Sequence, residues 1–124
     1  MTIVRFIMKQ YAWVFDPHSK NDTVPSALRE PVRRVILKAG DDLNLTPKNK
    51  LDVRFRGAFC YVDAFEPNDP HPTHLFRLRY SVSTKKWTVA LFAYSNESYV
   101  SCNFPSGDPL GQPEEAMPLA LTYL

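Results

Sequence analysis

The residues best suited to chemistry are two histidines and two aspartates that lie close together in the sequence. His71 and His74 follow Asp69, and Asp63 stands a short distance before them. Imidazole and carboxylate groups at such spacing can hold a metal ion or act as general acid and base. The loop around them is rich in proline and would present metal ligands poorly, so we predict no metal site and no cofactor.

Nucleophilic catalysis has weaker support in the sequence. Cys60 and Cys102 are the only cysteines, and no nucleophile signature surrounds either of them or His74. A small hydrolase-like or metal-assisted enzyme around His71, His74 and Asp63 is an alternative, but the sequence favours a non-catalytic role. Two cysteines without a signal-peptide pattern indicate a reducing cytoplasm rather than a disulfide.

A second group of residues combines arginine with aromatic rings. Strand alternation places Arg77, Arg79, Phe92, Tyr94 and Tyr99 on one sheet face, opposite the core. Arginine and aromatic residues are enriched at interface centres, so we predict that these five residues form a binding surface. The expected partner is another protein or a second copy of this chain, as in a homodimer. A single-stranded nucleic-acid binder is a further alternative, although the usual basic-aromatic motifs are missing. In a third interpretation, a helix covers this face and its rings form a second core layer.

The elements that would position these residues form an antiparallel sheet. We expect one long strand over residues 51–65, bent at Gly57, followed by three shorter strands up to Phe104. The predicted register sets Arg77 opposite Phe92 and Tyr94 opposite Tyr99, with Leu75 and Ser81 also on the outer face. The inner face should hold the core residues Phe55, Phe59, Phe76, Leu78, Trp87, Val89 and Leu91.

The sequence predicts three helices around this sheet, the first two from the helical spacing of apolar residues and the third from a proline and two glutamates that are typical of a helix start. The first covers residues 3–15 and is too short and too charged to cross a membrane. The second carries Val32 and Ile36, with Pro31 in its first turn and Gly40 at its end. The third begins at Pro113. The fold class is therefore α+β: a four-stranded antiparallel meander packed by N-terminal and C-terminal helices, in a single domain over residues 1–124.

The charge is balanced overall but unevenly distributed. Lys and Arg number 15 against 13 Asp and Glu, so composition does not demand a polyanionic partner. Residues 97–124 nevertheless contain Glu97, Asp108, Glu114 and Glu115 and no Lys or Arg. This inequality makes self-association through opposite charges conceivable.

Five short motifs between Arg54 and Leu124 carry a resemblance. They are RFRG at 54–57, YVDA at 61–64, PTHL at 72–75, FPSG at 104–107 and GQPEEA at 111–116. In these motifs the chain resembles a family of small bacterial proteins of unassigned function, and the resemblance implies no activity and no catalytic residues. Small proteins of this kind are frequent cargo of mobile gene cassettes, such as those of integrons.

Overall fold

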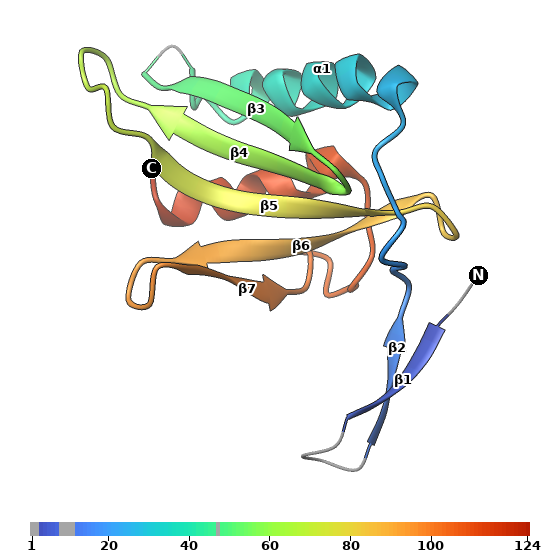
Figure 1. Cartoon of the computed structure of the whole chain (residues 1–124). Coiled ribbons are helices and arrows are strands. Elements are labelled where there is room, and N and C mark those ends of the chain that lie inside the picture. Colours follow the sequence, from blue (N-terminus) through green and yellow to red (C-terminus); the bar gives the residue numbers. More distant parts are fainter. Residues whose placement is uncertain (1–2, 8–11, 47) are drawn as a thin grey trace.

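The main part of the structure is an antiparallel sheet with two helices packed against it. The computed structural model describes residues 3–7, 12–46 and 48–124. Strands β3 to β7 pair in sequence order, while β1 and β2 pair only with each other and extend away from the main sheet (Figure 1). The elements are β1 (Ile3–Ile7), β2 (Ala12–Asp16), α1 (Ser26–Asp42), β3 (Lys50–Arg56), β4 (Phe59–Phe65), β5 (Thr73–Ser81), β6 (Lys86–Ala93), β7 (Ser98–Cys102) and the 3-10 helix η1 (Pro113–Thr122).

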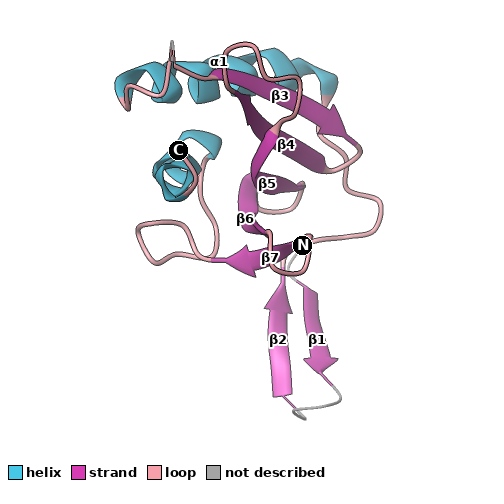
Figure 2. Ribbon diagram, turned by 90° about the vertical axis from the view of Figure 1, so that its left-hand side faces the viewer, coloured by secondary structure: helices cyan, strands magenta, loops and turns pink. Residues whose placement is uncertain are grey.

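Both helices lie on the same face of the sheet (Figure 2). Helix α1 buries Val32, Ile36 and Gly40, which recur every fourth residue, and η1 buries Ala116 and Met117 among others. The inner face of the sheet meets them with the buried side chains of Leu51, Val53, Cys60, Val62, Leu75, Phe76, Leu78, Trp87 and Val89. The opposite face carries no described helix, so its side chains are available to form a site.

The described N-terminal segment does not form the helix predicted for residues 3–15. Residues 3–7 and 12–16 form two antiparallel strands, so the helix expected over 3–15 is wrong, and residues 8–11 lie outside the described part of the chain. A short apolar run does not by itself distinguish a helix from a strand. The N-terminal helix of the domain is α1 instead, and no described helix is long and apolar enough to cross a membrane.

Helix α1 confirms the second predicted helix but not its ends. It begins at Ser26, so Pro31 stands inside it rather than in its first turn, and it continues past Gly40 to Asp42. Gly40 has another role, because a Cβ there would lie 2.5 Å from Cδ1 of Leu51. The missing side chain therefore lets α1 approach β3 closely.

The long first strand of the prediction is two strands, which makes the sheet five-stranded rather than four-stranded. Arg56 pairs with Phe59 across a two-residue turn in which Gly57 has a φ of 59°. Glycine adopts this left-handed conformation at little cost, as hairpin turns require. The reversal pairs Arg54 with Tyr61, which moves Phe59 and Tyr61 to the outer face. The expectation that Phe59 belongs to the core is therefore wrong, and Cys60 is buried in its place.

A bulge at the start of β5 changes the facing of its first residues. Val62 pairs with Phe76 but Asp63 pairs with His74, so Leu75 is an extra residue. Leu75 and Phe76 are both fully buried, contrary to the expectation that Leu75 faces outward. The bulge also turns His74 to the outer face, beside Asp63, as bulges commonly re-aim side chains.

The remaining strands keep the predicted faces with a shifted register. Arg77 pairs with Ala90 rather than Phe92, and Tyr99 pairs with Phe92 rather than Tyr94. Each shift is two residues, and side chains alternate with a period of two, so Arg77, Phe92 and Tyr99 stay on the outer face. The loop between β6 and β7 is longer than the tight turn expected, which explains the second shift.

Much of the predicted core is confirmed. Phe76, Leu78, Trp87 and Val89 are buried, while Phe55 and Leu91 are half-buried against the core. The predicted C-terminal helix is present as a 3-10 helix, with Pro113 at its start and a capping box between Gln112 and Glu115.

Replacing Leu78 with Ala should lower the free energy of unfolding by about 2–5 kcal/mol, because the lost packing leaves a cavity in a close-packed core. Leu121 provides a control of the same residue type, since it is 51% exposed against 0% for Leu78. Leu121→Ala should change stability by less than about 0.5–1 kcal/mol. Urea unfolding of both variants measures the difference, and equal losses would contradict the assigned core.

Candidate functional site

The outer face of the sheet gathers arginine, aromatic and acidic side chains in cross-strand rows. We call this set the outer face; its members are Asp52, Arg54, Arg56, Phe59, Tyr61, Asp63, His74, Arg77, Arg79, Phe92 and Tyr99. The loop after β2 covers one end of it, where Ser81 Oγ donates to the carbonyl of Pro17 at 2.8 Å. This contact explains why Ser81, expected outside, is buried.

Arg77 is held between two aromatic rings. Its guanidinium carbon lies 4.4 Å from the ring centre of Phe59 and 4.9 Å from that of Tyr99. Arg79 approaches the same Phe59 ring at 5.5 Å, and Arg54 approaches Tyr61 at the same distance. A guanidinium over a ring gains about 0.5–2 kcal/mol, so these contacts fix long side chains that would otherwise be mobile.

Three of the four arginines on the outer face have no acidic partner within the described chain. Arg54 forms ion pairs with Asp52 at 3.1 Å and Asp63 at 2.8 Å. No described carboxylate pairs with Arg56, Arg77 or Arg79. The arginine end of the face therefore carries three guanidinium groups that form no ion pair with a described carboxylate.

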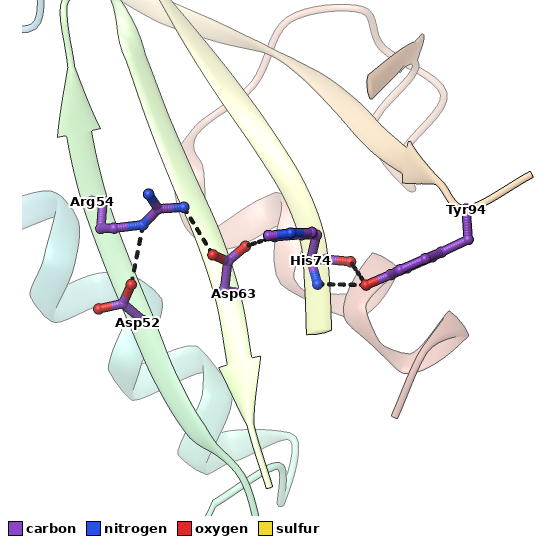
Figure 3. A network of polar contacts seen from close by, with 5 residues as sticks. All are labelled: Asp52, Arg54, Asp63, His74 and Tyr94. Carbon is purple, nitrogen blue, oxygen red and sulfur yellow. Dashed lines mark hydrogen bonds and ion pairs between the residues drawn. The ribbon is translucent and has the colours of Figure 1, made fainter. Parts of the chain in front are cut away.

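A buried carboxylate organises the other end of the face (Figure 3). The Asp63 side chain is only 3% exposed, and its two oxygens accept hydrogen bonds from different strands. Arg54 Nη2 on β3 donates to Oδ2 at 2.8 Å, and His74 Nδ1 on β5 lies 2.9 Å from Oδ1. A buried carboxylate is stable only when it is paired and hydrogen-bonded, and these two contacts supply both.

His74 is also held by two aromatic residues of β6 and its following turn. Its ring centre lies 4.8 Å from that of Phe92. The hydroxyl of Tyr94 accepts from the backbone N–H of His74 at 2.7 Å and donates to its carbonyl at 3.4 Å (Figure 3). The imidazole thus has a fixed position at the end of the sheet.

The five predicted binding residues lie in one continuous set of contacts. Phe92 makes edge contacts with Tyr94 at 4.7 Å and Tyr99 at 5.1 Å, and Tyr99 leads through Arg77 and Phe59 to Arg79. The sequence prediction missed Phe59 and Tyr61, because it treated β3 and β4 as one strand. Gly57 was the available signal, since glycine between two alternating segments also marks a hairpin turn.

Of the three residues considered for an enzyme site, only two lie in contact. Asp63 and His74 are in contact, but His71 pairs with Asp69 at 3.2 Å, and its side chain is 88% exposed. The hydrogen bonds from His71 lower the pKa of Asp69. Within the described residues, no group of three or more His, Cys, Asp or Glu side chains could hold a metal ion.

Both cysteines are unsuited to nucleophilic chemistry. Burial raises the pKa of Cys60 from 9.0 to about 12 and also raises the pKa of Cys102, which is half-buried. The reactive form is the thiolate, and these shifts suppress it. Partial burial and the nearby Asp63 raise the pKa of Tyr99 to about 12, so its hydroxyl remains neutral at physiological pH.

Comparison with family models, curated proteins and solved structures finds no significant match to this chain. The resemblance to small bacterial proteins stays a prediction. Three of its motifs, RFRG, YVDA and PTHL, supply Arg54, Asp63 and His74 respectively, so residues far apart in the chain meet in one hydrogen-bonded network.

Replacing Asp63 with Asn should lower the free energy of unfolding by about 1.5–3 kcal/mol, because the amide cannot accept charge-assisted hydrogen bonds from both Arg54 and His74. Asp52→Asn is the matched control, since Asp52 pairs with the same arginine but is 41% exposed. The Asp52→Asn substitution should lower the free energy of unfolding by less than about 1 kcal/mol. Chemical denaturation of the two variants tests this difference, and equal effects would show that Asp63 does not organise the sheet.

Alkaline pH should weaken the fold in part through Cys60. Above pH 9.0 the thiol loses its proton in the unfolded chain, whereas the buried thiol keeps its proton up to about pH 12. The protonated Cys60 thiol therefore contributes stability below pH 9.0 that is lost as the pH rises from 9.0 to about 12. The loss is up to about 1.4 kcal/mol per pH unit. Cys60→Ala should flatten this decline in urea-unfolding measurements, and an unchanged slope would contradict the assignment.

Proposed function

We propose that this protein is a non-catalytic binding module that captures an acidic segment of another protein on the arginine end of its outer face. The observation that carries the proposal is the placement of Arg77 between Phe59 and Tyr99 without a carboxylate partner in the described chain. A stacked guanidinium keeps its N–H groups at the edge of its plane, where they can bind a carboxylate through two hydrogen bonds.

The environment of Arg77 supports a protein interface. Arginine and aromatic side chains are the residues that contribute most binding energy at interface centres. Their rotamers are already restricted by the stacking contacts, so less conformational entropy is lost when a partner binds. Arg56 and Arg79 add two cations beside Arg77, which favours a partner of negative charge.

A second copy of this chain is one source of such a partner. Residues 97–124 contain Asp108, Glu114 and Glu115, which are exposed, and no Lys or Arg. Opposite charges steer association and set orientation. The cytoplasm remains the expected compartment, on the ground that Cys60 and Cys102 are unpaired thiols.

Nucleic acid and catalysis have less support. Single-stranded binding proteins stack bases on free ring faces, but guanidinium groups already lie over Phe59, Tyr61 and Tyr99. For an Asp–His hydrolase, a nucleophile should lie within hydrogen-bond reach of the imidazole. The described contacts of the His74 ring are with Asp63 and Phe92, and neither is a nucleophile for such a reaction.

Arg77→Glu should weaken self-association or partner binding by about tenfold or more, because it removes an interface guanidinium and reverses its charge. Sedimentation equilibrium of wild type and variant measures the dimer directly, and an acidic peptide carrying residues 106–116 of this chain serves as the probe for heterologous capture.

Arg29→Glu is the matched control, since Arg29 is an exposed arginine on α1, away from the outer face. It makes the same charge change and should leave binding unaltered. The proposal fails if wild type stays monomeric and does not bind the acidic peptide, or if Arg29→Glu weakens binding as much as Arg77→Glu. Binding to an oligothymidylate that falls steeply with salt and drops in Tyr99→Ala would instead support the nucleic-acid alternative.

A further inference from the structure

A hollow beside His74 lies at the other end of the outer face. It has a volume of about 430 Å³ and is open to solvent. Pockets for small molecules usually measure about 300–1,000 Å³. The turn between β4 and β5 and the turn between β6 and β7 form its sides, and its lining residues are His71, Pro72, His74, Phe92, Tyr94 and Glu97.

The imidazole of His74 offers a hydrogen-bond acceptor to this hollow. Its Nδ1 faces the carboxylate of Asp63, which also accepts from Arg54 and is therefore held as an acceptor. A neutral imidazole must then carry its proton on Nδ1, which leaves the lone pair on Nε2. No described residue is hydrogen-bonded to Nε2, and the His74 side chain is 35% exposed. A ligand can therefore reach it.

The second polar group of the hollow is negatively charged. Glu97 stands in the turn after β6, is exposed, and forms no ion pair with a described residue. Asp63 is paired with Arg54, Asp69 is hydrogen-bonded to His71, and no Lys or Arg is among the described residues that line the hollow. The uncompensated charge at this end is therefore negative, opposite to that of the arginine end.

The remaining walls are apolar and aromatic. Pro72, Phe92 and Tyr94 line the hollow, and Tyr94 is 49% exposed. Aromatic faces attract cations, and their rings also bury apolar groups. An acceptor, a carboxylate and exposed aromatic surface together match a cation that donates hydrogen bonds, which is the chemistry of a primary ammonium group.

We propose that this hollow binds a small primary amine in its ammonium form, attached to an aromatic or apolar body. The ammonium donates one hydrogen bond to Nε2 of His74 and is attracted by Glu97, while the body of the ligand packs on Phe92, Tyr94 and Pro72. The site is independent of the capture of acidic segments, because it lies at the other end of the face and selects the opposite charge.

Three small ligands of similar size test the proposal with the full chain. Benzylamine carries charge and donors, benzyl alcohol has a donor without charge, and benzyltrimethylammonium has charge without donors. Two-dimensional NMR titration near neutral pH should show saturable shifts confined to residues around His74 and Tyr94 with benzylamine. The other two ligands should bind about tenfold more weakly, because each lacks one of the two interactions. Absence of saturation with benzylamine, or equal binding of the three, would overturn the proposal.

Glu97→Gln and Glu30→Gln form a matched pair of variants in exposed positions. The first should weaken benzylamine binding about threefold, and the second, which lies on α1, should leave it unchanged. Benzylamine binding that is indifferent to Glu97→Gln, or that weakens as much in the control variant, rejects the site.

Discussion

The bulge at Leu75 determines the arrangement of both faces of the sheet. Regular alternation would turn Leu75 outward and His74 inward, exposing a large apolar side chain and burying an imidazole. With the extra residue, Leu75 and Phe76 are both fully buried and His74 meets Asp63 on the outer face. Burying a leucine side chain stabilises a fold by about 1.5–3 kcal/mol, so core packing favours the irregular strand. The position of His74 follows from that packing.

The ion pairs around Asp63 give the two ends of the outer face different charges. Because Asp63 and Asp52 are both paired with Arg54, they do not neutralise Arg77 or Arg79. Aromatic rings from β4, β6 and β7 lie between the two ends and hold the guanidinium groups in place. Among the described residues, one end of this sheet surface thus carries arginines without ion-pair partners, and the other end carries Glu97, which also forms no ion pair.

Periodicity in the sequence predicted the elements whose backbones are regular. Helix α1 follows from apolar spacing of three to four, and the facing of Leu78 and Val89 follows from a spacing of two. The helix after Pro113 was predicted from its start signals, which are the proline and the two glutamates that follow it. Prediction failed where the backbone is irregular, at the Gly57 turn and at the Leu75 bulge. An extra residue or an unrecognised turn places every later side chain of a predicted strand on the wrong face. Because the turn at Gly57 was missed, Phe59 was assigned to the core.

The helix prediction for the N-terminal segment was wrong for a different reason. Its apolar residues fit a helical stripe, but they also form short runs around Arg5, which is equally typical of strands. The β-branched residues Ile3, Val4 and Ile7 were the signal that favoured strands. Arg77, Phe92 and Tyr99 stay on the predicted face of the sheet despite these errors, because the register shifts of β6 and β7 are even and an even shift preserves the face.

The charges of the outer face argue against its being only a second core layer. In such a layer, guanidinium groups would be buried beside carboxylates, because an unpaired buried charge is costly. Instead Arg77 and Arg79 approach the ring of one residue, Phe59, at 4.4 and 5.5 Å, and no described carboxylate pairs with either. Like charges around one ring repel each other, which lowers stability where no carboxylate pairs with them. Local departures from optimal stability are expected at functional sites. In the function that we propose, an anionic partner relieves this repulsion, and the stacking on Phe59 and Tyr99 keeps the Arg77 guanidinium in position to bind it.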